Sequence, residues 1–394
     1  MKERFLIITF LGDLIDISAV RADFKNKTVN VIFQEKIKFD SLSKLKKIFL
    51  TSFYPQTYKV ILAFDSKNAL TNHETISLKR EDPKKAIDEA DIENLVSQAL
   101  WKVFDYGRIM STKQLNLNDL EILLVDTKIH ELKIDGRRVL NPIKQKGEKI
   151  DITVSQTFAN RSLFDRVSKM LPKRAKIVLA IEGGVAASRL IGRLAGKKNF
   201  VFGKVLDDAT SIHIAKKDSG GKISFFDYFS WGKNGFYASL EVELGVCRDT
   251  GKSILKKFFK KEMSDEFERR FGKIFSQEII GLTRGLTHAA SRTKHNLVFL
   301  DFPPLIPNKN LPKMILPVDS IQAMKFLGFK QGSGFFDFIP GINPLLLSRR
   351  KNISNGTYQQ PDFVSLASLF EFYFLPQEDL VNRLAKRRIR WLMP

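Results

Sequence analysis

The sequence predicts an α/β protein of two lobes, with a smaller α+β unit inserted into the first lobe. Its 394 residues exceed what a single hydrophobic core usually holds. Strand-like apolar runs alternate with amphipathic helical runs along most of the chain, as in α/β folds. The composition is globular, with 43% apolar and 27% charged residues, and the 33 phenylalanines favour packed sheet layers.

The first unit is expected over residues 1–82. It contains strand-like runs at FLIITFL, TVNVIFQEKIKF and YKVILAF, and a helical run near SLSKLKKIFLTSF. The basic and then apolar start resembles a signal peptide, but Gly12 and Asp13 interrupt it and no cleavage pattern follows, so we interpret it as a strand. No run reaches the ~18 apolar residues that a membrane-spanning helix needs.

The inserted α+β unit is predicted over residues 83–170, after a linker at Asp82. Asp88 is a candidate N-cap for the helix that follows. The pair Asp135–Gly136 between β-rich runs is a strong hairpin signal. A further strand, KIDITVSQTFA, and a helix, SLFDRVSKML, complete the unit. The expected buried face of the first helix is Ile92, Leu95, Val96, Ala99, Leu100 and Val103.

The remaining sequence returns to the first unit and then forms a second. KIVLAIEGGVAASRLIGRLAG predicts a strand, a Gly-Gly turn and a helix, and VLDDATSIHI predicts two strands joined by a turn. QPDFVSLASLFEFYFL predicts a late helix. The boundaries expected are 171–195 for the rest of the first unit, 196–225 and 296–374 for the second, 226–295 for a helical/β subdomain and 375–394 for an amphipathic tail.

Cysteine usage and charge limit the compartment and the partners. Cys247 is the single cysteine, which excludes an intramolecular disulfide, fits a reducing compartment and is interpreted as a buried small side chain. The net charge of +22 predicts an anionic partner: nucleic acid, acidic lipid or an acidic protein. Ten Lys and Arg against one acid lie in 166–204, for which a solvated face is favoured over a binding patch. Because the aromatics do not alternate with basic residues as in a stacking sheet, nucleic acid is not expected.

Catalytic and metal motifs are not recognised. CRDTGKS has the wrong glycine spacing for a phosphate loop, and the five histidines lack ligand spacing. No nucleophile stands with a partner base. We therefore predict neither catalytic residues nor a metal site.

The order of these units resembles FtsA, the actin homologue of bacterial cell division. The resemblance is most specific in REDPKKAIDEADIENLVSQALWKVFD and ILLVDTKIHELKIDGRRVLNPIKQKGEKIDITVSQTF, which look like the subdomain inserted in FtsA. Within it, Asn141 and Pro142 before the Gly147 turn are similar to an Asn-Pro-hydrophobic segment of that subdomain. The resemblance implies a two-lobed, actin-like (ribonuclease H-like) fold.

The resemblance also implies where a nucleotide would bind, and this chain departs from the pattern there. Actin-like proteins use two Gly-rich hairpin loops, each with an Asp, and a third Gly-rich turn. Here Thr9 and Lys204 stand at the two Asp positions, and Asp207 and Asp208 replace glycines. New carboxylates repel an anionic phosphate, and side chains at glycine positions block backbone approach. We therefore expect no ATP hydrolysis and no cofactor, with ATP and Mg in a rearranged site as the alternative. The degenerate loop residues are Thr9, Gly12, Lys204, Asp207, Asp208 and Thr210, and in the third turn Asp301, Phe302 and Pro303.

The tail at 378–392 predicts an amphipathic helix with a basic polar face. Such helices lie in lipid interfaces, and FtsA ends in one. The competing interpretation is a helix packed back on the domain. We expect a protein at the cytoplasmic face of the cell membrane, peripherally bound to anionic lipid. The predicted membrane-binding residues are Leu380, Val381, Leu384, Arg387, Arg388, Trp391 and Leu392.

By resemblance, the function is a scaffold that links the tubulin-like division protein FtsZ to the membrane, through the helical subdomain at 226–295. Self-association is left open. One alternative is a scaffold of type IV pilus assembly similar to PilM, which would bind a short peptide of a membrane partner. Another is an active actin-like ATPase or sugar-kinase-like enzyme.

Overall fold

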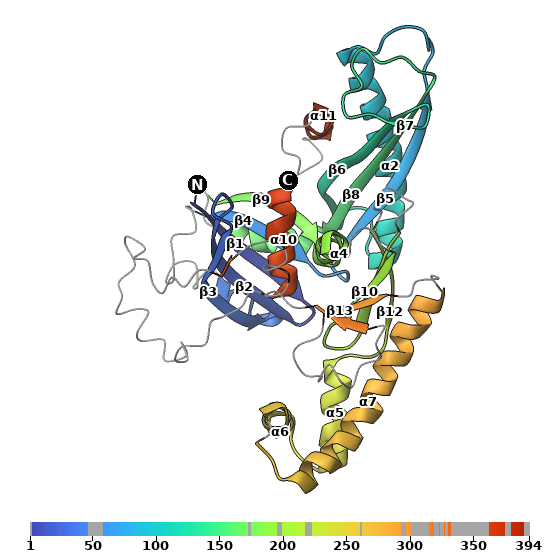
Figure 1. Cartoon of the computed structure of the whole chain (residues 1–394). Helices are drawn as coiled ribbons and strands as arrows, with labels where there is room; N and C mark the ends of the chain where they lie inside the picture. Colours follow the sequence, from blue (N-terminus) through green and yellow to red (C-terminus); the bar gives the residue numbers. More distant parts are fainter. Residues whose placement is uncertain are drawn as a thin grey trace.

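A computed structural model describes residues 2–45, 58–171, 175–194, 199–216, 223–260, 262–292, 297–301, 315–318, 323, 327, 330–331, 362–374 and 380–389. The chain forms two sheet-based lobes side by side, with an inserted subdomain on one side and a helical arm on the other (Figure 1).

The first sheet has the strand order β15-β3-β2-β1-β4-β9. β1, β2 and β3 are antiparallel neighbours, whereas β4 and β9 run parallel to β1. Residues of β1 alternate between two hydrophobic cores: Phe5 and Ile7 lie in one, and Leu6 and Ile8 in the other. The sheet is thus buried on both faces. Its strands are β1 (Lys2–Leu11), β2 (Leu14–Asp23), β3 (Thr28–Lys38), β4 (Lys59–Phe64), β9 (Lys176–Glu182) and β15 (Lys330–Gln331), with a short 3-10 helix η1 (Phe39–Ser41) after β3.

The second sheet repeats this topology, with the order β12-β11-β10-β13-β14. Its first three strands are again antiparallel, and the next two again run parallel to the central strand. The β1–β2 turn of the first lobe therefore corresponds to the β10–β11 turn of the second. The strands are β10 (Phe200–Val205), β11 (Thr210–Ala215), β12 (Ile223–Phe229), β13 (Val298–Asp301) and β14 (Ile315–Pro317).

Two helices fill the space between the sheets. α10 (Phe363–Phe374) packs on β1 and β4, α4 (Gly183–Leu194) packs on β11 and β12, and the two helices pack on each other (Figure 1). The prediction that 296–374 belongs wholly to the second unit is therefore wrong for α10. Its buried apolar face takes part in the core next to β1.

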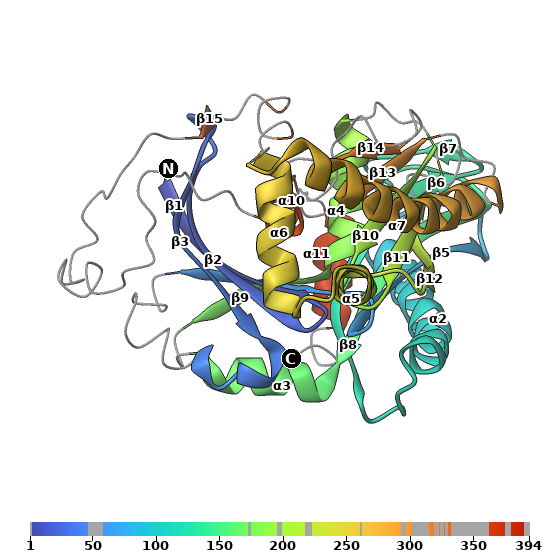
Figure 2. The same cartoon turned by 90° about the horizontal axis from the view of Figure 1, so that it is seen from below.

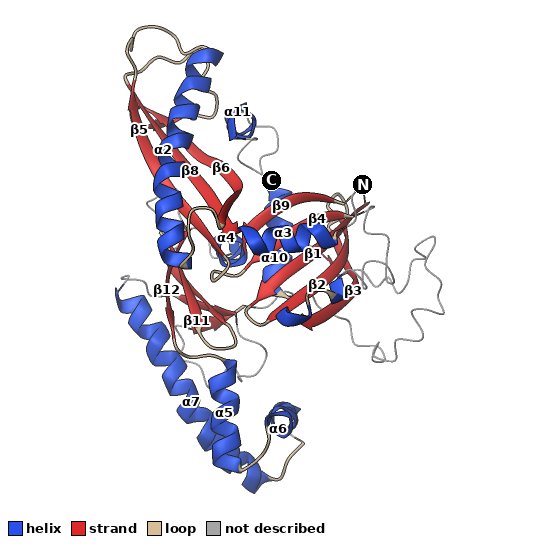
Figure 3. Cartoon of the chain, turned by 180° about the vertical axis from the view of Figure 1, so that it is seen from behind, coloured by secondary structure: helices blue, strands red, loops and turns tan. Residues whose placement is uncertain are grey.

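The insert, as we call the sheet β5-β8-β6-β7 and helix α2, forms a separate layered unit with α2 along its strands (Figure 3). Asp88 caps α2 in a capping box with Asp91, and Asp135–Gly136 forms the tight turn with positive φ, as predicted. The predicted face of α2, from Ile92 to Val103, is buried. The elements are β5 (Ala69–Lys79), α2 (Glu89–Leu115), β6 (Ile122–Ile134), β7 (Arg137–Arg138) and β8 (Lys149–Asn160).

Both predicted boundaries of the insert are wrong. β5, assigned to the first unit, pairs with β8 along its whole length and belongs to the insert. α3 (Arg161–Met170), assigned to the insert, packs Leu163 and Val167 into the core of the first sheet. The predicted boundary followed the change in composition at the linker after residue 82. The extent of the insert sheet is instead set by the pairing of β5 with β8, which lie about 80 residues apart in the sequence.

Three helices form an arm that leaves the second sheet, and the view from below looks onto them (Figures 1 and 2). They are α5 (Lys233–Leu244), α6 (Arg248–Lys260) and α7 (Asp265–Arg292). Leu282 and Leu286 of α7 pack on the second sheet. Cys247 lies exposed between α5 and α6, so its predicted burial is wrong.

The last helix, α11 (Leu380–Ile389), lies against the insert. Among the residues that the structure describes, no helix combines the length and the apolar character needed to cross a bilayer. The predicted helix near SLSKLKKIFLTSF falls largely outside the described residues.

Candidate functional site

The two corresponding turns meet between the lobes. Gly12 in the β1–β2 turn has a φ of 71°, and the next residue, Asp13, donates its backbone N–H to Oδ2 of Asp207 in the β10–β11 turn at 3.1 Å. A Cβ atom on Gly12 would lie 3.2 Å from the same oxygen. The carboxylate of Asp207 therefore reaches the backbone of the opposite turn.

A second carboxylate accepts a hydrogen bond from the neighbouring backbone N–H group. The N–H of Gly12 donates to Oδ2 of Asp65 at 2.9 Å. Asp65 directly follows β4 and is buried, and burial raises the pKa of its carboxyl. Asp207 is balanced by Lys233, whose Nζ lies 3.0 Å from Oδ1. By the resemblance, these amides are where a phosphate would bind, and the chain's own carboxylates hold them.

The other predicted residues of this turn face elsewhere. Asp208 accepts a hydrogen bond from Nδ2 of Asn234 at 2.8 Å, in an exposed position at the arm. Thr210 donates to the backbone oxygen of Trp231. The expectation that both acids occupy a phosphate position is thus wrong for Asp208, because adjacent residues in the turn point in different directions.

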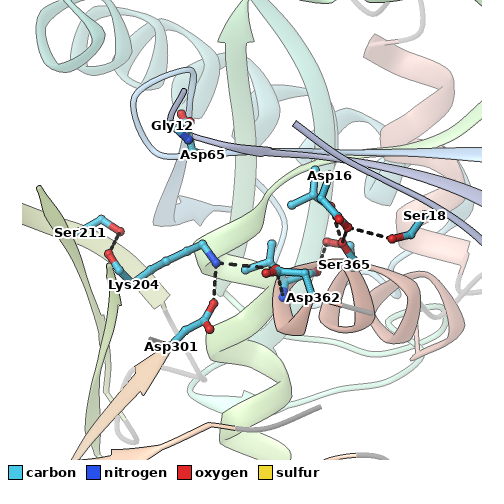
Figure 4. Close-up of polar contacts among 12 residues, drawn as sticks. Gly12, Asp16, Ser18, Asp65, Lys204, Ser211, Asp301, Asp362 and Ser365 are labelled. Atoms are coloured by element: carbon cyan, nitrogen blue, oxygen red, sulfur yellow. Dashed lines mark hydrogen bonds and ion pairs between the residues drawn. The ribbon is translucent and has the colours of Figure 1, made fainter. Parts of the chain in front are cut away.

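Lys204 of β10 places a cation in the centre of the site (Figure 4). Its Nζ lies 2.5 Å from Oδ2 of Asp301 and 3.7 Å from Oδ1 of Asp362, which precedes α10. Burial would lower the pKa of the ammonium, but the two carboxylates outweigh burial and raise it. Lys204 therefore stays charged and joins the second lobe to the central helix.

Asp16 and Thr9 complete this polar layer from the first sheet. Oδ2 of Asp16 accepts hydrogen bonds from Ser18 at 2.8 Å and from Ser365 of α10 at 3.2 Å (Figure 4). Burial, followed by the charge of Asp362, raises the pKa of Asp16. The hydroxyls of Thr9 and Ser365 are 2.7 Å apart. Thr9, at the position of the family's Asp, thus helps to hold α10.

A second buried contact between the lobes joins Glu182, at the end of β9, to His213 of β11. His213 Nε2 lies 2.7 Å from Glu182 Oε1, and Ser66 donates to the same oxygen at 2.9 Å. Ser66 and Glu182 both contact Nε2 of the histidine. A nucleophile–base–carboxylate relay needs the two partners on opposite ring nitrogens, so this group is not arranged as one.

Gly184 at the start of α4 allows the histidine to lie there. A Cβ atom on Gly184 would come within 2.0 Å of the His213 ring, whereas one on Gly192 of the same helix would meet only ordinary contacts at 3.7 Å or more. We expect Gly184→Ala to lower the free energy of unfolding by about 1–3 kcal/mol because of overpacking. Gly192→Ala, the matched control, is expected to be neutral or to stabilise by up to about 1 kcal/mol. Urea unfolding of both variants checks this; equal effects would contradict it.

The space left between the lobes is small. A cavity of about 10 Å³ lies beside Lys204. That volume holds about one water molecule. The cavity is lined by Phe10, Phe64, Asp65, Ser66, Gly183, Gly184, Lys204, Leu206, Ser211 and Val364.

Tertiary structure adds residues that sequence reasoning missed at this site. Of the predicted residues, Gly12 lies against Asp207, whereas Thr9 and Lys204 contact Ser365 and Asp362 at the start of α10. Asp65 and Ser365 were not identified, since neither belongs to a loop of the resemblance. Asp362 had a detectable signal: it precedes a helix as an N-cap residue does, and it accepts the N–H of Val364 at 3.0 Å.

A separate charged cluster fixes the insert to the central helices. Glu371 of α10 accepts from Lys128 of β6 and from Arg189 of α4, each at 2.7 Å. Despite burial, the two cations hold the pKa of Glu371 at about 2. The pKa of Lys128 is lowered, mainly by burial and also by Arg189. The cluster therefore stabilises the ionised form of Glu371 but disfavours the charged form of Lys128. Burial and Arg189 also lower the pKa of His130 well below its usual value.

The described cations of the basic stretch 166–204 have different surroundings. Lys204 and Arg189 are used in the buried ion pairs above. Arg193 stacks its guanidinium over Phe374 at 4.2 Å. Lys173, Arg174, Lys197 and Lys198 lie outside the described residues. The favoured interpretation of this stretch as a solvated face is therefore wrong for Arg189 and Lys204, whose charges are held in buried ion pairs.

The predicted membrane-binding residues are mostly covered by protein. Val381 and Leu384 are 3% exposed and belong to the core of the insert, and Leu380 is half-buried against it. Arg387 and Arg388 pair with Glu93 of α2. In this arrangement the expectation that the apolar face meets lipid is wrong, because β6 and α2 bury it. Trp391 and Leu392 lie outside the described residues.

Comparisons with known proteins identify the fold. The sequence matches no protein-family model and no curated protein. The structure is similar to the PilM–PilN type IV pilus biogenesis complex, with a TM-score of 0.52, 13% identity, and coverage of 93% of this chain and 97% of that chain. Weaker similarity is found to a protein from Bacteroides thetaiotaomicron with an actin-like ATPase fold and unknown function, with a TM-score of 0.40, 12% identity, and coverage of 82% and 95%. MreB 5 of Spiroplasma citri bound to AMPPNP gives a TM-score of 0.38, 11% identity, and coverage of 82% and 93%.

The chain has the actin-like fold. The duplicated sheet order and the likeness over nearly the whole PilM–PilN chain agree on this point. The predicted fold class is confirmed, whereas none of these similarities is specific to FtsA.

Proposed function

We propose that this protein is an actin-fold scaffold that neither needs nor hydrolyses ATP. One observation carries the proposal: the chain's own charges fill the positions that would serve a nucleotide. Carboxylates of Asp65 and Asp207 accept hydrogen bonds from the backbone N–H groups of Gly12 and Asp13, where the resemblance places phosphate. The Lys204 ammonium lies beside the carboxylates of Asp301 and Asp362. A bound phosphate would have to displace both carboxylates and face their negative charge.

We further propose that the scaffold serves a membrane-bound assembly of the pilus type and holds a short segment of a membrane partner. The likeness to the PilM–PilN complex, which spans nearly all of both chains, supports this choice. The second candidate is an FtsA-like link to FtsZ, favoured by the insert motif around Asn141.

Nucleotide binding tests the first proposal. Titration with a fluorescent ATP analogue and Mg²⁺ is expected to give no saturable signal, and a phosphate-release assay no turnover above buffer. An ATP-hydrolysing actin homologue is the positive control. Turnover that disappears in Asp207→Asn, with the fold intact by circular dichroism, would overturn the proposal; Asp208→Asn, one residue away but outside the interlobe space, is the matched control.

Peptide binding separates the two candidates. Labelled cytoplasmic segments of PilN-like membrane proteins and the C-terminal tail of FtsZ, all from the same genome, are titrated with the full chain by fluorescence anisotropy. We expect saturable micromolar binding of a PilN-like segment and none of the FtsZ tail. The reverse result supports the division scaffold, and binding of neither rules out both assignments.

A further inference from the structure

α11 completes the helical layer of the insert. α2 lies mainly over β5 and β8, and α11 packs beside α2 and over β6. Val381, Leu384 and Ala385 of α11 are buried in the same core as Ile129 of β6. A segment that follows β6 by about 250 residues thus covers the part of the sheet that α2 leaves open.

Polar contacts of Asn382 and Glu93 hold α11 against the insert. The side-chain oxygen of Asn382 accepts a hydrogen bond from the N–H of Ile129 at 2.8 Å, and its Nδ2 donates one to the carbonyl oxygen of Ile129 at 3.0 Å. A neighbouring β-strand would pair with both backbone groups in the same way. Glu93 of α2 pairs with Arg387, and with Nε of Arg388 at 2.9 Å. The hydrogen bond from Arg387, followed by the charges of both arginines, lowers the pKa of Glu93.

The same helix has the composition of one that binds an anionic bilayer. Its ten residues include four cations, Arg383, Lys386, Arg387 and Arg388, and no acid; all four are exposed, and the last two also pair with Glu93 of α2. A bilayer offers an apolar medium for the buried face and phosphates for the guanidinium groups that now contact Glu93. It offers nothing equivalent to the backbone of Ile129.

We propose that the insert stores α11 and that anionic lipid competes with the insert for the same face of the helix. Because Val381 and Leu384 cannot be buried in both places, the protein binds membrane only when α11 leaves the groove. The stored state lowers the apparent lipid affinity by the fraction of molecules in which α11 is released. Asn382 and Glu93 set that fraction.

Point variants test this better than removal of the tail, which would also uncover the core of the insert. Sedimentation with phosphatidylcholine vesicles, with and without phosphatidylglycerol, is measured together with hydrogen exchange of the α11 amides. Asn382→Ala is expected to tighten binding to anionic vesicles about tenfold, and Glu93→Gln about two- to fivefold, with loss of amide protection in α11. Glu89→Gln, which removes the same charge from the first turn of α2, is the control. It is expected to change neither vesicle binding nor the protection of the α11 amides.

Adding Leu384→Asp to Asn382→Ala should abolish the gained binding, since the apolar face is then lost. The proposal fails if α11 is released in the variants but vesicle binding does not rise. It also fails if the wild type binds vesicles while α11 stays protected, if neutral vesicles bind equally, or if α11 stays protected in both variants. Release of α11 by a PilN-like peptide and not by lipid would show that the competitor is a protein. The ATP and peptide assays above report on the scaffold proposal separately.

Discussion

Lys204→Met is expected to lower the free energy of unfolding by about 3–5 kcal/mol, because it leaves buried carboxylates without their cation. The ammonium lies 2.5 Å from Asp301 and 3.7 Å from Asp362, and Asp16 is close enough for its charge to contribute to the raised pKa of Lys204. Methionine keeps most of the side-chain volume, so the change removes charge and little packing. Urea unfolding near neutral pH measures the loss.

The surface pair Lys79–Glu148 provides the control for that experiment. Its charged atoms are 3.1 Å apart, but the side chains are 81% and 57% exposed. Lys79→Met should therefore cost no more than about 1 kcal/mol. If Lys204→Met costs as little, the ammonium does not stabilise the contact between the lobes.

The loss of stability caused by Lys204→Met should become smaller at acidic pH. Without the cation, the buried carboxylates have folded-state pKa values above their unfolded ones, so their ionised forms destabilise the folded state. Protonation removes this penalty as the pH falls from about 7 towards 4. A difference from the wild type that stays constant over this range would show that lost packing, and not charge, causes the effect.

Glu371→Gln is expected to lower the free energy of unfolding by roughly 3 kcal/mol at pH 7. The pKa of Glu371 is about 2 instead of 4.5, and a shift of this size corresponds to roughly 3 kcal/mol. The cause is the pair of cations, Lys128 and Arg189, that a neutral amide leaves uncompensated. Because this folded-state pKa is depressed, the contribution is complete above the unfolded pKa of 4.5 and is lost as the pH falls from 4.5 to about 2. The difference in the free energy of unfolding between wild type and variant, measured by urea unfolding, should therefore disappear as the pH falls through this range.

Asp126, near the same cluster, should behave in the opposite way. Burial, more than any neighbouring charge, raises the pKa of its carboxyl to about 6. Asp126→Asn removes an ionised group that destabilises the folded state at pH 7, so this variant should be as stable as the wild type or more stable. If both variants lose stability at pH 7 with the same pH dependence, specific charge pairing does not explain the Glu371 effect.

Local elements were predictable because their signals lie within a few residues. The capped start of α2 at Asp88, the Asp135–Gly136 turn and strands such as β1, β4, β9 and β11 follow from side-chain period and turn chemistry. The altered loop residues Thr9, Lys204 and Asp207 were also visible, because they stand in positions that the resemblance defines. Their chemical identity is a property of the sequence alone.

Partners in space were not predictable in the same way. Amphipathicity shows that a face of a helix will be buried, but not what will bury it. The amphipathic pattern of α11 is compatible with burial by lipid or by protein; we predicted lipid, but β6 and α2 cover the apolar face.

The sequence by itself indicated a two-lobed α/β fold with an inserted α+β unit, and it fixed which side chains stand at the loop positions that the resemblance defines. Tertiary structure decided which charges meet between the lobes, because Asp65 and Asp362 reach this place from elements 53 residues from Gly12 and 158 residues from Lys204. Electrostatic compensation of a buried charge depends on distance in space, and only the packed lobes bring these side chains together.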